Sequence, residues 1–147
     1  MAGHGSSLPL ALAIIAFAGG FHLYWALGGR VGFSVSLPQR ADGAPVMAHR
    51  LGWWRPAAGA VALGLAMLGL LVLAEARRVA LPVPPGLVRA ALAATGAAFV
   101  LRALVPNRYV GFFKGLRSTR WARFDTRLYS PLFLLLGLLL LALAWDS

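Results

Sequence analysis

Four long apolar segments separated by polar connections dominate the pattern of the chain. They cover about residues 8–27, 56–74, 87–105 and 130–145, and the first runs from Leu8 to Leu27 without a formal charge. A helix needs about 20 apolar residues to cross a hydrocarbon core of about 30 Å. We therefore predict an all-α fold: a four-transmembrane-helix bundle, with short interfacial segments in the first and third loops, in which residues 1–147 form a single integral membrane domain.

The first apolar segment has one rival interpretation, a cleaved signal peptide. Ala16-Phe17-Ala18 resembles a small-residue cleavage site, but the first seven residues contain no lysine or arginine. A signal peptide begins with a positively charged region. We therefore expect this segment to remain as the first span.

Two of the predicted helices have proline at their start, and the helices differ in their small residues. Pro56 opens the second span, and Ser130-Pro131 is a helix-start pattern for the fourth, because serine caps free amides and proline fits the first turn. Small residues recur at every fourth position in two spans, and such faces let helices approach closely in lipid: Ala58, Ala62 and Ala66 in the second span, and Ala90, Ala94 and Ala98 in the third. The leucine-rich fourth span has no such stripe, so we expect it to have much lipid contact.

The first loop contains an alternating pattern. Val31, Phe33, Val35 and Leu37 alternate with small or polar residues. A period of two is typical of a strand. A short strand or hairpin on the membrane face and an extended loop are both compatible with this pattern.

Composition agrees with a membrane protein. The chain is 60% hydrophobic with a mean hydropathy of +0.76, and only 12% of its residues are charged, against about 25% in soluble domains. The net charge of +10 lies in short loops between apolar segments, so no nucleic-acid partner is expected. The absence of cysteine excludes disulfides and thiolate chemistry.

The distribution of charge predicts the orientation. With four spans, ten arginine or lysine residues fall in the first and third loops and three fall on the opposite side. Positively charged loops stay in the cytoplasm. We therefore predict that both termini lie outside the cytoplasm. The ten are Arg30, Arg40, Arg50, Arg55, Arg108, Lys114, Arg117, Arg120, Arg123 and Arg127, and the three are Arg77, Arg78 and Arg89.

Residues 112–131 mark the boundary between this basic side and the membrane. Basic residues alternate with aromatic residues here, immediately before an uncharged segment. Arginine and lysine bind anionic head groups, and aromatic rings lie at the interface. We predict lipid head-group contacts for Lys114, Arg117, Arg120, Arg123 and Arg127.

Polar side chains at the ends of the spans should meet at this same leaflet. We predict a polar pocket or ligand-binding site there, formed by His22, Tyr24, Trp25, Arg102, Asp125 and Tyr129. A charge at the membrane edge that faces inward usually pairs, and it is a functional candidate. The tyrosines and tryptophans can equally be interfacial anchors.

Asp125 has no basic residue three or four positions away. Its partner must therefore be Arg102, Arg55, His22 or a residue of the first loop. Two roles remain open for it: a pin that fixes the third loop to the bundle, or a substrate or proton site. Arg102 can pair with Asp125 or extend its head group to water. His22 can carry protons or bind a backbone carbonyl.

No cofactor or metal ion is expected. His22, His49 and Asp125 lack ligand spacing. The four acids do not form a close pair, which excludes two-carboxylate chemistry.

Two motifs carry a family resemblance. The motif His22-x-Tyr24-Trp25 ends the first span, and the segments Gly111-Phe112-Phe113-Lys114 and 124–132 precede the fourth. Together they resemble a bacterial family of small four-helix membrane proteins catalogued as a domain of unknown function. The resemblance covers nearly the whole chain and implies four spans in a bacterial inner membrane.

The sequence favours binding or handling of a lipid head group or small amphiphile in the cytoplasmic leaflet. One alternative is a structural or accessory subunit that docks a membrane-protein partner or another copy through its small-residue faces. Another is a small transporter that must oligomerise. An enzyme that uses His22 as an acid–base group is the remaining hypothesis.

Overall fold

The computed structural model describes residues 4–47 and 52–145, and helices dominate these residues. Four helical spans are long and apolar enough to cross a membrane. The elements are α1 (His4–Ala26), the short 3-10 helix η1 (Phe33–Val35), α2 (Trp54–Glu75), α3 (Pro85–Leu104), α4 (Arg120–Phe124), the π-helical turn η3 (Asp125–Tyr129) and α5 (Ser130–Trp145). Because α4, η3 and α5 follow one another without a break, they form the fourth span. The predicted all-α, four-span fold is confirmed.

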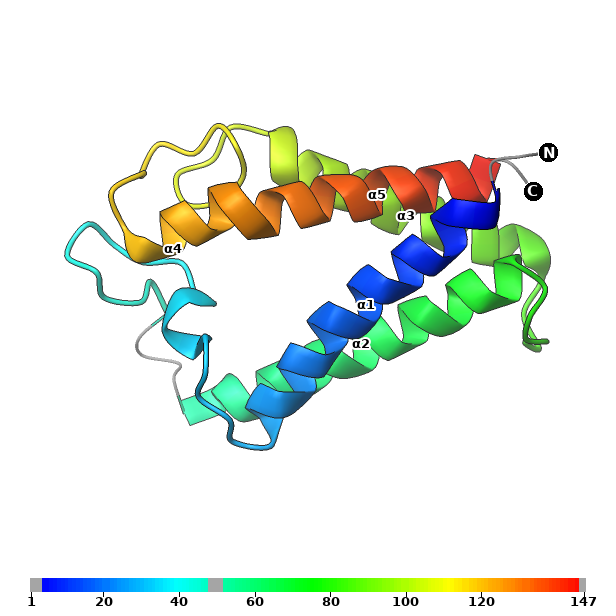
Figure 1. The fold of residues 1–147 in the computed structure, drawn as a ribbon, viewed down its shortest axis with the longest axis horizontal. Coiled ribbons are helices and arrows are strands. Elements are labelled where there is room, and N and C mark those ends of the chain that lie inside the picture. Colours follow the sequence, from blue (N-terminus) through cyan, green and yellow to red (C-terminus); the bar gives the residue numbers. More distant parts are fainter. Residues whose placement is uncertain (1–3, 48–51, 146–147) are drawn as a thin grey trace.

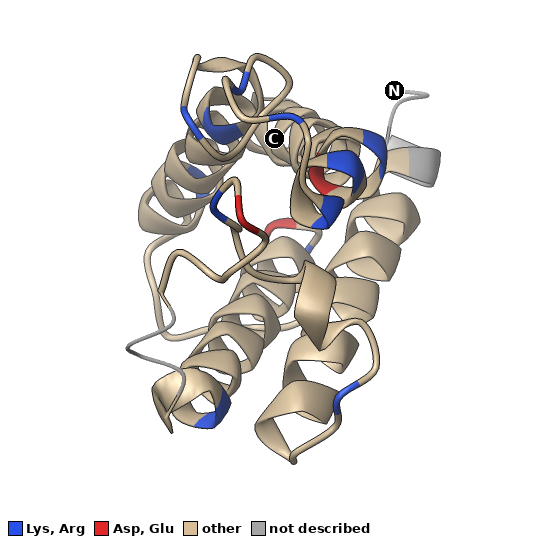
Figure 2. Ribbon diagram, turned by 90° about the vertical axis from the view of Figure 1, so that its left-hand side faces the viewer, with Lys and Arg blue, Asp and Glu red and all other residues tan. Residues whose placement is uncertain are grey.

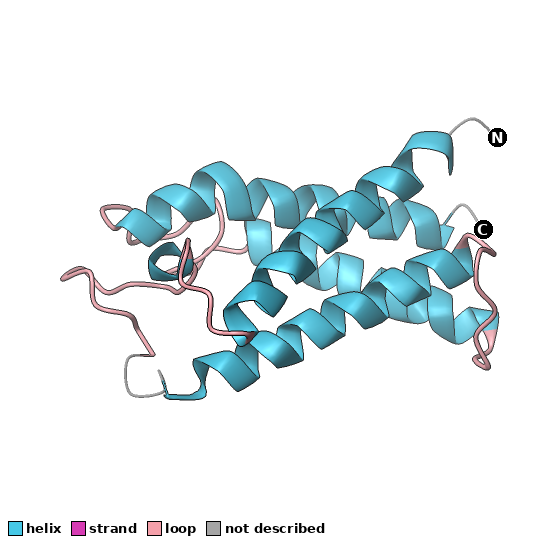
Figure 3. Cartoon of the chain, turned by 60° about the horizontal axis from the view of Figure 1, so that its bottom comes forward, coloured by secondary structure: helices cyan, strands magenta, loops and turns pink. Residues whose placement is uncertain are grey.

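The helices associate as two pairs, α1 with α2 and α3 with α5. The pairs lie close together at the end that holds the 76–84 turn and diverge toward the end that holds the two long loops (Figures 1 and 3). η1 lies near α4 at the divergent end. The two pairs therefore meet through side chains at one end and through the first loop at the other.

The α3–α5 pair is built around two facing glycines. A Cβ on Gly96 would lie 2.8 Å from the Gly137 carbonyl oxygen, and a Cβ on Gly137 would lie equally close to the Gly96 carbonyl. Leu136, Leu140 and Leu143 of α5 are buried in the core, and α5 also contacts α1 and α2. One glycine therefore suffices to seat α5 against α3. Most of the fourth span is still not buried within the protein, so the expected lipid contact stays a prediction.

Two glycines of α2 pack against α1. Gly59 lies against Ala26 and Gly69 against Ile15, both in α1. The alanine face of α3 is different, because its members are exposed: Ala90, Ala94 and Ala98.

The fourth span begins ten residues earlier than the predicted start at 130. Thr119 is the N-cap, and its hydroxyl accepts a hydrogen bond from the Ala122 amide at 3.1 Å. Ser130 and Pro131 therefore lie inside a continuous helical run and do not start it. Pro56, by contrast, lies in the first turn of α2, two residues after its start at Trp54, where its missing N–H costs nothing.

The alternating segment of the first loop is not a strand. Gly32 adopts a φ of 74°, and the chain then turns into η1. The one isolated β-bridge within residues 4–47 and 52–145 joins Gln39 and Pro45. His49 and Arg50, used in the metal and orientation arguments, lie outside the described residues.

Candidate functional site

Asp125 is the centre of a buried polar cluster. It begins η3, is 0% exposed and accepts hydrogen bonds at both carboxylate oxygens. Arg102 Nη2 lies 2.7 Å from Oδ1. The Gly111 amide at 2.9 Å, Lys114 Nζ at 2.9 Å and Ser130 Oγ at 3.0 Å all donate to Oδ2. Of the partners that the sequence left open for Asp125, Arg102 is therefore the one present, and four donors surround one carboxylate.

The π-helical turn explains how Ser130 reaches Asp125. In an α-helix, with about 100° per residue, side chains five positions apart point to different sides. The wider turn of η3 brings the two side chains together, and the Ser130 amide donates to the Asp125 carbonyl. Pro131 follows directly, and it has no N–H with which to continue the α-helical pattern. The Ser130-Pro131 pair thus shapes the polar cluster rather than a helix start.

Lys114 is the member of the cluster that sequence reasoning misplaced. Its side chain is 1% exposed, so it does not reach lipid head groups as predicted. Its ammonium donates to the Gly111 carbonyl at 2.7 Å, to Asp125 and to the Thr126 hydroxyl at 2.7 Å. Lys114 satisfies three acceptors with three protons, which compensates its burial. The signal in the sequence was Gly111, three residues before it.

Gly111 permits the third loop to fold back onto α3. Its φ is 85°, and a Cβ there would lie 2.9 Å from the carbonyl oxygens of Arg102 and Ala103. The Phe112 amide donates to the Ala103 carbonyl at 2.8 Å. Only glycine combines this backbone conformation with so close an approach.

Arg102 completes the cluster from α3. Its Nη1 donates to Ser130 Oγ at 3.2 Å, and its Cζ lies 4.2 Å from the centre of the Phe133 ring. The cluster thus contains two cations and one anion. Because both Asp125 oxygens accept from protein donors and the residue is fully buried, the arrangement supports a pin that holds the third loop to α3 and η3.

Tyr129 and Trp121 extend this packing. Their ring centres lie 5.2 Å apart, and the Trp121 indole N–H donates to the Tyr109 carbonyl at 2.8 Å. Tyr129 is half-buried. Trp121 therefore connects the start of the fourth span to the third loop, and Tyr129 packs against Trp121.

His22, Tyr24 and Trp25 form a separate group on α1. His22 Nδ1 lies 2.8 Å from the Ala18 carbonyl oxygen, which is the backbone interaction considered above. The Trp25 indole donates to the Val31 carbonyl at 2.8 Å, and the Tyr24 hydroxyl accepts from the Val31 amide at 3.3 Å. Tyr24 and Trp25 therefore hold the first loop to α1.

The two groups lie at the same end of the molecule, the end toward the viewer in Figure 2. Among the described residues no hydrogen bond or ion pair joins His22 to Asp125. The bridge between the helix pairs is instead Gln39 of the first loop, whose side-chain oxygen accepts from the Trp121 amide at 3.0 Å. A ligand-binding role for the six predicted residues stays a prediction.

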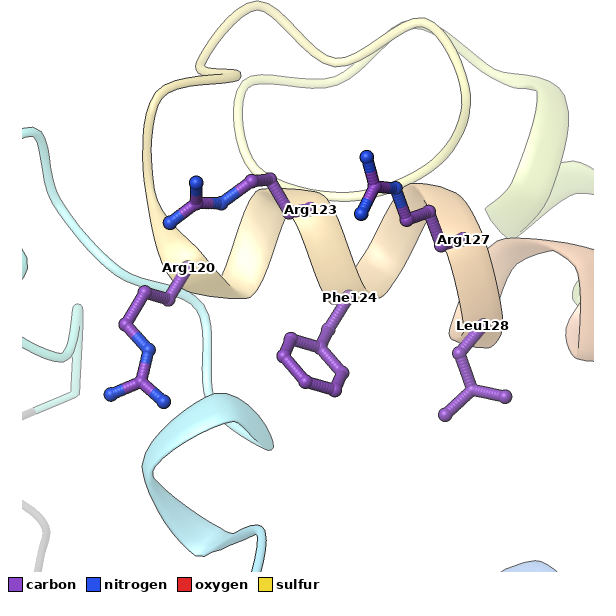
Figure 4. A pocket seen from close by; sticks show the side chains of 5 residues that line it. All are labelled: Arg120, Arg123, Phe124, Arg127 and Leu128. Atoms are coloured by element: carbon purple, nitrogen blue, oxygen red, sulfur yellow. The ribbon is translucent and has the colours of Figure 1, made fainter.

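A surface cavity of about 400 Å³ lies against α4 and η3. Figure 4 shows Arg123 and Arg127 extending along one side of the helix, and Arg120, Phe124 and Leu128 along the other. The three arginines are exposed, and none of the ion pairs among the described residues involves them. Arg117 is exposed as well, and its Nε donates to the Lys114 carbonyl at 3.1 Å. This cavity combines uncompensated positive charge with apolar surface.

No group of three or more histidine or acidic side chains within the described ranges is placed to hold a metal ion. The features above define a multi-pass membrane protein of four helical spans, in which a buried ion-pair cluster fixes the third loop.

Residues 14–140 match the family described as protein of unknown function (DUF3995), and the chain belongs to this family. The resemblance to a domain of unknown function is thereby confirmed. No curated protein and no solved structure matches the chain.

Proposed function

We propose that this protein binds the head groups of anionic membrane lipids at the outer face of α4 and η3. The supporting observation is the cavity that Arg120, Arg123 and Arg127 share with Phe124 and Leu128. Arginine binds phosphate through two parallel hydrogen bonds. Apolar side chains beside it suit the part of a lipid where the head group meets the acyl chains.

The location of this face follows from the charge distribution. We propose that the protein lies in a bacterial cytoplasmic membrane, with both long loops in the cytoplasm and both termini outside. The cavity then faces the cytoplasmic leaflet, whose surface carries anionic lipid. A basic residue near such a surface contributes about 1 kcal/mol to binding.

The Asp125 cluster gives the binding face its rigidity. Arg123 and Phe124 directly precede Asp125, which is held from α3 by Arg102 and from the third loop by Lys114. Its carboxylate has no free oxygen for a ligand, so we assign the cluster a supporting role. We therefore propose that head groups bind at the exposed arginines of α4 and η3, and not in the pocket predicted around His22 and Asp125.

The test is native mass spectrometry of the full chain released from bilayers of phosphatidylcholine and phosphatidylglycerol. The variant R120Q/R123Q/R127Q removes the cavity arginines. The matched control R30Q/R40Q/R108Q removes three exposed arginines at the same end but outside the cavity. Because a charge-assisted hydrogen bond contributes about 1.5–3 kcal/mol, the cavity variant should lose about tenfold or more of any preference for phosphatidylglycerol beyond the loss seen in the control variant. An equal loss in both variants would show that only overall charge matters.

A structural or accessory role is the second candidate. The observation that favours it is the exposed alanine face of α3, at Ala90, Ala94 and Ala98. Small residues permit close contact between helices in lipid. A Leu substitution at Ala94 should then disrupt a complex seen by mass in mild detergent, and a monomer in both wild type and variant counts against this role.

A further inference from the structure

Two of the three arginines of the cavity repel each other along the helix. Arg123 and Arg127, which extend on the same side of the helix in Figure 4, are four positions apart. Such a spacing makes side chains neighbours, and like charges there are destabilising. The structure offers no acid to any of the three among its described ion pairs. A bound anion that contacts two of them at once would remove this repulsion.

Figure 4 shows how the charges are divided around the cavity. One side carries Arg123 and Arg127 together, and the other carries Phe124 and Leu128, with Arg120 at its end. A ligand with charge on one side and apolar surface on the other matches this division. Phe124 is 43% exposed, so an apolar surface is available to the ligand.

Resting on the proposed function, we infer that the preferred ligand is a lipid with a terminal phosphomonoester, as in phosphatidic acid. A phosphomonoester carries a charge of about −1.5 to −2 and three strong acceptor oxygens. It can therefore bridge Arg123 and Arg127, which extend on the same side of the helix. A phosphodiester lipid such as phosphatidylglycerol has a single negative charge, so it neutralises only one of these arginines.

The cavity favours a lipid over free phosphate. Its volume of about 400 Å³ lies at the low end of the roughly 300–1,000 Å³ typical of ligand pockets. This volume suits a head group with its glycerol, and the acyl chains then continue outside it. Free phosphate would leave Phe124 and Leu128 without a partner, and their contact with glycerol and the first methylenes adds apolar burial that inorganic phosphate lacks.

The experiment measures binding of short-chain lipids to the full chain in a zwitterionic detergent, by calorimetry. The probes are dioctanoyl phosphatidic acid, its methyl ester dioctanoyl phosphatidylmethanol, dioctanoyl phosphatidylcholine and inorganic phosphate. The methyl ester keeps the size of phosphatidic acid but removes one charge. Because a charge-assisted hydrogen bond contributes about 1.5–3 kcal/mol, phosphatidic acid should bind about tenfold or more tightly than the ester.

Single substitutions test which arginines cause the preference for phosphatidic acid over its methyl ester. Arg123→Gln and Arg127→Gln should each bring the two affinities close together, whereas the matched control Arg40→Gln should leave their ratio unchanged. Arg123→Lys keeps the charge but not the paired hydrogen bonds, and it should give an intermediate ratio. Retained tryptophan fluorescence and thermal midpoint show that each variant is folded.

The outcomes separate this inference from the proposed function. Equal binding of phosphatidic acid and its methyl ester, with both well above phosphatidylcholine, overturns the inference but leaves anionic-lipid binding intact. Equal binding of all three lipids overturns both. Inorganic phosphate that competes as strongly as phosphatidic acid overturns the assignment to a lipid.

Discussion

Asp125→Asn should destabilise the protein strongly, although the side chain keeps its shape. All four groups around the carboxylate are donors: Arg102, the Gly111 amide, Lys114 and Ser130. An amide has only one acceptor oxygen, so its NH₂ group must face at least one of these donors. The substitution also leaves two cations without their anion, and Lys114 is 1% exposed.

The size of this effect follows from the burial of the cluster. Removing one partner of a buried ion pair typically costs about 3–5 kcal/mol. Lys114→Met should cost less, about 1–3 kcal/mol. It leaves Arg102 paired with Asp125, with no net charge, whereas Asp125→Asn leaves two cations without an anion. The order of the two losses therefore tests whether charge balance holds the cluster together.

The assay is equilibrium unfolding in mixed micelles with increasing sodium dodecyl sulfate, followed by tryptophan fluorescence. Trp121 is buried four residues before Asp125, so it contributes a signal from this region to the summed fluorescence of the five tryptophans. The control is Asp42→Asn, an exposed carboxylate that accepts one hydrogen bond from the Ala44 amide within its turn. A loss for Asp125→Asn below about 1 kcal/mol would refute the pin, and a larger loss for Lys114→Met than for Asp125→Asn would refute the argument from charge balance.

Three further predictions concern packing, the loop bridge and orientation. Gly96→Ala places a Cβ 2.8 Å from a backbone carbonyl of α5 and should cost about 1–3 kcal/mol in the same unfolding assay; Gly64→Ala, with nothing within 4 Å, should be neutral or slightly stabilising. Gln39→Ala removes the acceptor of the Trp121 amide and should speed hydrogen exchange at α4; unchanged exchange would mean that this bond does not hold the first loop. A cysteine at Ala41 should resist an impermeant thiol reagent in intact cells, whereas one at Pro82 should react. The opposite pattern would reverse the proposed orientation, and the chain has no cysteine of its own to interfere.

The Arg102–Asp125 pair shows how far reasoning from the sequence reached. Asp125 lacks a basic neighbour at helical spacing, and a carboxylate at the membrane edge needs a partner. These two facts limited the choice to a few residues, one of which was Arg102. They did not reveal Lys114, because its approach depends on the fold of the third loop at Gly111.

The start of the fourth span shows where local patterns failed. Ser130-Pro131 has the chemistry of a helix start, yet the helical run begins at Arg120. A π-helical turn absorbs the proline and directs Ser130 to Asp125. The hydrogen bonds to the buried Asp125 carboxylate outweighed the local preference of Ser130-Pro131 for a helix start. Asp125 is itself positioned by contacts with residues distant in the sequence, such as Arg102.

The sequence by itself determined that four helices are long and apolar enough to cross a membrane, because apolar length and the need to satisfy backbone groups in lipid leave few other arrangements. It also determined which end of the helices carries the polar residues. Only the tertiary structure decided that His22 and Asp125 belong to separate groups and that Lys114 is buried. It alone showed that α5 lies against α3 through Gly96 and Gly137. The physical reason is that hydropathy acts on each segment separately, whereas ion pairs and close helix contacts depend on which segments meet.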